Sequence, residues 1–98
     1  MQIMKMEQVY AQIRDIAKQH QVKKIVLFGS RARGDYQEKS DIDLAVYDCQ
    51  DFLGFSCQLE EELWSLLRLD LIDMSAISVS EELINEIERD GVILYEAV

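Results

Sequence analysis

The stretch KIVLFGSRARGDYQEKSDIDLAVY, residues 24–47, decides how this chain folds. It begins with a short apolar run, residues 24–28, which is typical of a strand buried on both faces. It ends with residues 41–47, where polar and apolar side chains alternate, and this alternation predicts a second strand with one face in the core. The polar residues between the two runs predict a loop that can hold one helical turn.

Outward from this pair, the remaining residues predict three helices and two strands. Apolar side chains at helical spacing predict the helices, and short apolar runs predict the strands. The expected helices span about residues 4–19, 51–67 and 81–89, and the expected strands span residues 69–74 and 92–95. For the last helix we expect a capping box of Ser78 and Glu81 and a left-handed stop at Gly91.

This order of elements predicts one domain, residues 1–98, of the α/β (α+β) class, with a small mixed sheet flanked by helices. The net charge of −9 argues against direct binding to nucleic acids, which takes a basic face. No run approaches the roughly 18 apolar residues of a membrane span, and the start lacks the features of a signal peptide. We therefore expect a cytoplasmic protein that does not contact a membrane.

The cysteines and the histidine do not predict a metal site. The spacing of Cys49 and Cys57 fits no zinc or redox motif, so both are expected to be reduced thiols. The single histidine, His20, follows the first predicted helix among polar residues, and it is expected on the surface, in water.

Two acids open the second predicted strand. Asp41 and Asp43 are two positions apart, so their side chains leave the same side of the strand, about 6.6–7 Å apart. Carboxylate oxygens are the ligands that hard divalent cations favour, and two like charges on one side repel each other unless a positive charge lies between them. The pair therefore predicts a metal site on a strand that the core holds firmly.

The turn after the first strand carries groups suited to phosphate. Gly29 lets a ligand approach the backbone closely, and the N–H groups of a helical start suit phosphate oxygens. Ser30 adds a hydroxyl donor, while Arg31 and Arg33 add guanidinium groups. A phosphate-binding turn opposite a metal site is the arrangement that phosphoryl or nucleotidyl transfer needs. The alternative is a polar loop with two solvated aspartates.

A third carboxylate is expected from the next predicted strand, which offers Asp70 and Asp73. The two positions have opposite parity, so only one of them can face the side of Asp41 and Asp43. If Leu71 packs in the core, Asp70 faces the metal site, and Asp73 lies on the other face or at the end of the strand.

The residues FGSRARG at 28–34 and SDIDLAV at 40–46 resemble the DNA polymerase β-type nucleotidyltransferase superfamily, and within it the minimal nucleotidyltransferases. The resemblance covers nearly the whole chain and implies a polymerase β-like nucleotidyltransferase fold. The catalytic and metal-binding residues that it implies, for two Mg²⁺ ions, are Asp41, Asp43 and Asp70. The residues that it implies for binding ATP are Gly29, Ser30, Arg31 and Arg33. The implied reaction is in-line attack of a hydroxyl on the α-phosphate of ATP, with release of pyrophosphate.

Minimal members of this family resemble the antitoxin of type VII-like toxin–antitoxin systems, whose partner is a helical HEPN-domain toxin encoded next to them. The implied function is adenylylation of a tyrosine on that toxin. Larger relatives carry a second domain that grips the acceptor, and 98 residues leave no room for one, which favours an acceptor on another protein. Two alternatives stay open: an antitoxin that acts by binding alone, and an oligomeric nucleotidyltransferase for small molecules. Homo-oligomerisation is also left open.

Overall fold

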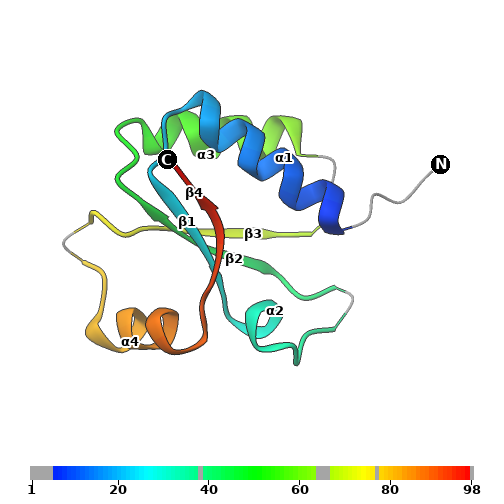
Figure 1. Cartoon of the computed structure of the whole chain (residues 1–98), viewed down its shortest axis with the longest axis vertical. Coiled ribbons are helices and arrows are strands. Elements are labelled where there is room, and N and C mark those ends of the chain that lie inside the picture. The colour runs from blue at the N-terminus through cyan, green and yellow to red at the C-terminus, as the bar shows by residue number, and fades with distance from the viewer. Residues whose placement is uncertain (1–5, 38, 64–66, 77, 98) are drawn as a thin grey trace.

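The computed structural model describes residues 6–37, 39–63, 67–76 and 78–97. They form a mixed sheet with helices on both of its faces, in the α/β arrangement that the sequence predicts (Figure 1). The elements, in chain order, are α1 (Met6–Gln19), β1 (Lys24–Phe28), α2 (Ser30–Arg33), β2 (Ile42–Tyr47), α3 (Phe52–Glu62), β3 (Leu69–Asp73), α4 (Glu81–Asp90) and β4 (Val92–Glu96).

The sheet has the strand order β3-β2-β1-β4, so β1 and β2 are central and β3 and β4 are the edges. β1 runs antiparallel to both of its neighbours, and β2 runs parallel to β3, with α3 forming the connection between them. This register gives Asp43 a partner on each side, Phe28 in β1 and Asp70 in β3. β2, which carries the predicted metal ligand Asp43, therefore lies between the turn that follows Phe28 and the strand that carries Asp70.

Each face of the sheet has its own apolar cluster. Side chains such as Leu27, Ile42 and Leu44 pack against α1 and α3 on one face. On the other face Phe28 and Ala45 pack against α4 through side chains such as Ile87. Figure 1 shows α1 and α3 on one side of the strands and α4 on the other. Because side chains alternate along a strand, Asp43 shares the α4 face with Phe28 and Ala45.

The second long helix is shorter than expected. We predict it over residues 51–67, but α3 ends at Glu62, and Leu63 has an extended backbone (φ −71°, ψ 121°). The last turn holds three glutamates and no basic residue, which is unfavourable beside the negative end of the helix dipole. Trp64, which the sequence places at the margin of this helix, lies outside the described residues.

The last helix begins at Glu81 as predicted and ends one residue later than expected, but both of its predicted caps are wrong. Ser80, not Ser78, caps α4: its side chain accepts a hydrogen bond of 3.2 Å from the backbone N–H of Leu83. Gly91 is extended (φ −67°, ψ 146°) rather than left-handed. Glycine is required at this position for a different reason: a Cβ there would overlap the carbonyl oxygen of Ile87 and a methyl group of Val26. Gly91 thus lets α4 turn closely into β4.

His20 differs from its sequence prediction, whereas the two cysteines agree with theirs. His20 is half-buried rather than fully solvated: its Nε2 lies 2.5 Å from Oε1 of Gln58, and its ring meets Phe55 edge-on. Both cysteines are free thiols, as expected, and Cys49 is buried. Within the described ranges, none of the helices is both long enough and apolar enough to cross a membrane.

Candidate active site

The centre of the candidate site is the contact between Gly29 and Asp43. Gly29 joins β1 to α2 with φ 76° and ψ −157°, a backbone conformation that is essentially restricted to glycine. A Cβ at this position would overlap Oδ2 of Asp43. The turn and β2 therefore meet with no room for a side chain between them, and the two halves of the sequence motif lie together.

The electrostatics of Asp43 report a concentration of negative charge. Its pKa is raised, first by burial and then by the carboxylates of Asp70, Asp41 and Glu86. The nearby guanidinium of Arg33 acts in the opposite direction. Several acids thus face one small region, and this is the environment in which a cation would be stabilised.

The third acid lies where strand parity predicts. Asp70 pairs with Asp43 in the parallel register of β2 and β3, so both side chains leave the same face. Asp73 pairs with Val46 and belongs to the opposite face, where its charge acts on Cys49. Its Oδ1 also accepts the N–H of Ser75, at 3.0 Å. The structure separates the two aspartates geometrically, and the catalytic role of Asp70 stays a prediction.

The remaining residues of the motif flank this contact. The predicted helical turn exists: the carbonyl of Gly29 accepts the N–H groups of Ala32 and Arg33, both at 3.1 Å. Ser30 is the first residue of this turn and is half-exposed. Asp41 is exposed and precedes β2, which begins one residue later than expected, at Ile42.

Arg31 holds the loop between the two strands together. It is 8% exposed, the one buried charged side chain among the described residues. Its Nε donates to the carbonyl of Ser40 at 3.1 Å, and its guanidinium carbon lies 4.8 Å from the ring centre of Tyr36. It also hydrogen-bonds Tyr10 of α1, whose pKa is nevertheless raised by burial. The sequence does not predict this structural role of Arg31. Its contact with phosphate stays a prediction.

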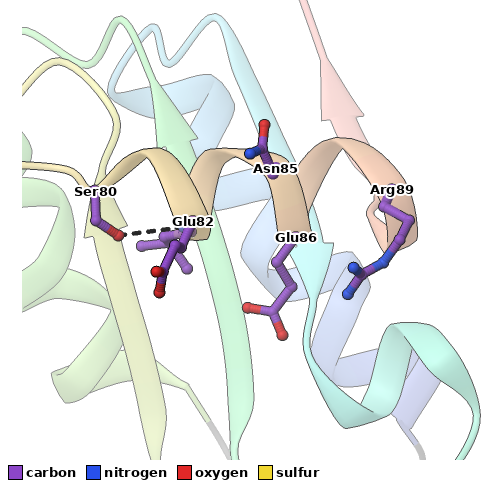
Figure 2. A pocket seen from close by; sticks show the side chains of 6 residues that line it. Ser80, Glu82, Asn85, Glu86 and Arg89 are labelled. Atoms are coloured by element: carbon purple, nitrogen blue, oxygen red, sulfur yellow. Dashed lines mark hydrogen bonds between the residues drawn. The ribbon is translucent and has the colours of Figure 1, made fainter.

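Arg33, by contrast, has a side chain that is 37% exposed, and its charge acts on Asp43. Its Nε is 3.3 Å from Oδ2 of Asp35, and its Nη1 is 3.3 Å from Oε1 of Glu86. Glu86 belongs to α4, 53 positions further along the chain, and Figure 2 shows its side chain leaving that helix. Sequence reasoning missed Glu86. Its position next to Ile87, which is buried on the sheet, is the signal that could have placed it near the site.

The donor set fits a hard divalent cation. Asp41, Asp43 and Asp70 offer only carboxylate oxygens, the ligands that Mg²⁺ prefers. Within the described ranges no three acidic, histidine or cysteine side chains already converge on one point. Mg²⁺ is commonly held by one or two carboxylates together with substrate phosphates rather than by a cage of protein ligands. The arrangement thus suits a metal that arrives with a phosphorylated substrate.

Comparison with known proteins places this geometry in a family. The family described as "Polymerase beta, Nucleotidyltransferase" matches residues 11–97. Two relatives from Methanocaldococcus jannaschii, each named as a candidate protein adenylyltransferase, are 46% and 39% identical to the chain. The first match covers 66% of this chain and 61% of the relative, and the second covers 76% and 94%. The chain thus spans about three fifths of the length of the first relative.

Solved structures show the same fold. A toxin–antitoxin crystal structure with AMP-PNP is 26% identical, with a TM-score of 0.68, over 90% of this chain and 73% of the matched chain. A candidate minimal nucleotidyltransferase is 25% identical, with a TM-score of 0.63, over 91% of this chain and 95% of that one. The chain belongs to the polymerase β-type nucleotidyltransferase family. It is similar in structure to a candidate minimal nucleotidyltransferase.

Proposed function

We propose that this chain is a Mg²⁺-dependent adenylyltransferase that moves AMP from ATP to a hydroxyl group of a partner protein. The acceptor that we infer is a tyrosine of a HEPN-domain toxin encoded beside it, which the modification neutralises. Two comparisons support the proposal. The relatives in M. jannaschii are named as candidate protein adenylyltransferases, and a similar structure is a toxin–antitoxin complex with an ATP analogue.

The observation that carries the proposal is the close approach of Gly29 to Asp43. Nucleotidyl transfer needs the phosphates and the metal-binding acids to share one small volume, because the charge that develops on the phosphate must be stabilised where it forms. Here the turn with phosphate-type donors lies directly against the central acid. A turn and a strand separated by a side chain would not offer this.

Each residue of the site then has a proposed part. The turn at Gly29 and Ser30 binds the triphosphate, and Arg33 is a further phosphate contact. Asp41 and Asp43 would hold Mg²⁺, and Asp70 would share one ion and orient the acceptor hydroxyl. When bound, Mg²⁺ neutralises phosphate charge and lowers the barrier to attack. The chain itself binds the phosphates, orients the hydroxyl and collects its proton on a carboxylate.

The test is neutralisation of the toxin encoded beside this chain. Cells that express the toxin would be supplied with the wild-type chain, with Asp43→Asn, or with Asp73→Asn as the matched control on the opposite face of the sheet. We expect rescue by the wild type and by Asp73→Asn, no rescue by Asp43→Asn, and a mass increase of one AMP on the toxin only where growth is rescued. Full rescue by Asp43→Asn, with an unmodified toxin, would show that binding alone neutralises and would overturn the enzyme.

A further inference from the structure

Glu86 is the acid at the site to which neither the motif nor the proposed chemistry assigns a part. It comes from α4, whose side chains Leu83 and Ile87 pack on the same face of the sheet that carries Asp43. Glu86 is near enough to Asp43 for its charge to act on that carboxyl group. In Figure 2, Glu82, Glu86 and Arg89 leave one side of the helix. α4 thus presents a carboxylate close to Asp43 and Arg33.

The partner of Glu86 is Arg33, a residue that the proposed function assigns to phosphate. The pair bridges α4 and α2, with 3.3 Å between Nη1 and Oε1. A second carboxylate, Asp35, lies 3.3 Å from Nε of the same guanidinium. Both distances exceed the 2.7–2.9 Å that is typical of strong charge-assisted hydrogen bonds. The Arg33 and Glu86 side chains are 37% and 35% exposed, so water screens their attraction.

We propose that Glu86 competes with the nucleotide for Arg33. Without nucleotide, the ion pair with Glu86 holds the Arg33 side chain toward α4, and binding of the triphosphate breaks this pair. This inference rests on the proposed nucleotide site. A triphosphate carries several negative charges and can accept the planar guanidinium bidentately, whereas Glu86 offers one half-exposed carboxylate. The exchange moves Arg33 from a weak partner to a stronger one. Glu86 then weakens nucleotide binding in proportion to its hold on Arg33.

The experiment is a double-mutant cycle that measures binding of α,β-methylene-ATP in the presence of Mg²⁺. In this analogue the bridge between the α- and β-phosphates cannot be cleaved. We expect Glu86→Gln to bind the analogue about two- to fivefold more tightly than the wild type, the range that a half-exposed ion pair supports. Glu82→Gln is the matched control, since it removes the same charge one turn earlier on the same side of α4. It should bind like the wild type.

Arg33→Gln decides between competition and simple repulsion. If Glu86 acts through Arg33, the gain from Glu86→Gln disappears in the Arg33→Gln background. An equal gain in both backgrounds, or a gain shared by Glu82→Gln, would overturn the inference and leave long-range repulsion as the cause. No change in Glu86→Gln, with normal binding by the wild type, would overturn the inference and leave the proposed function standing. No binding by the wild type would overturn the nucleotide site itself.

Discussion

The two halves of the candidate site are held in different ways. The inner half, Gly29 and Asp43, sits on the central strands, where neighbours such as Ile42 and Leu44 have no exposed surface. The outer half, Asp70 and Glu86, comes from an edge strand without a fully buried residue and from one helix. Close packing leaves the inner half a single arrangement. Glu86 is held by a half-exposed ion pair with Arg33, which water screens, so a ligand can rearrange it at small cost.

The largest expected effect is that of Gly29→Ala. The substitution adds a Cβ at a positive φ and drives it into the carboxylate of Asp43. We expect a loss of about 1–3 kcal/mol in the free energy of unfolding, and a loss of activity of about 100-fold from displacement of the acid. Gly34→Ala is the control: φ is also positive (90°), but among the described residues beyond its chain neighbours no atom lies within 4 Å of the added Cβ. Equal activity losses in both variants would contradict the packed inner half.

The next effect separates the two acids of β3. Asp70→Asn is expected to lower the transfer rate about 100-fold, because it removes a charge on the face of Asp43. Asp73→Asn alters the opposite face and should change the rate less than threefold, the scale of a minor local adjustment. Single-turnover kinetics with saturating ATP would measure both. Similar losses in the two variants would mean that the register of β2 and β3 does not organise the site.

The two arginines of α2 should divide between stability and binding. Arg31→Met removes a buried cation that contacts Ser40 and Tyr36, so we expect unfolding to become easier by about 1–3 kcal/mol. Arg33→Met removes half-exposed ion pairs, and its stability should change by less than about 1 kcal/mol. Urea denaturation would measure both, and ATP affinity should suffer more in Arg33→Met. Equal stability losses in the two variants would contradict a structural role for Arg31.

The smallest effect concerns pH and Asp43. A raised pKa means that the folded chain binds this proton more tightly than the unfolded chain, so ionisation of Asp43 lowers stability as pH rises. In EDTA, Asp43→Asn should be more stable than the wild type at neutral pH. The advantage should shrink as pH falls through the raised pKa, and vanish below the ordinary value of 3.8. Paired urea titrations at pH 7 and pH 3 would measure it, and a constant difference would contradict the charged cluster.

Local patterns were enough to predict the two central strands of the inner half, but not the contact between Gly29 and Asp43. The apolar run of β1 and the alternation of β2 follow directly from which faces are buried, and a two-residue period then places Asp41 and Asp43 together. Parity also selects the face of Asp70, because the parallel register lines Leu71 up with Leu44. These inferences need only the chain's own periodicity, and the structure has the elements where the patterns predict them.

The part of the outer half that comes from α4, Glu86, could not be predicted in this way. A glutamate on an amphipathic helix usually faces water, and only the packing of α4 on the sheet brings Glu86 to Arg33, 53 positions away. Likewise, an arginine after a glycine-serine turn suits phosphate, while the observed Arg31 interacts with Tyr10 and Tyr36, which lie outside α2. Contacts of this kind are decided by tertiary packing, which the local pattern does not contain.

The central claim is that the packed contact of Gly29 and Asp43 serves transfer of a nucleotidyl group. The most direct test incubates the chain and the toxin that we propose as its partner with Mg²⁺ and ATP labelled either on the α-phosphate or on the γ-phosphate. We expect the α-label to move to the toxin, the γ-label to leave as pyrophosphate, and Asp43→Asn to abolish both. Transfer of the γ-label to the toxin, or undiminished transfer of the α-label by Asp43→Asn, would contradict the central claim.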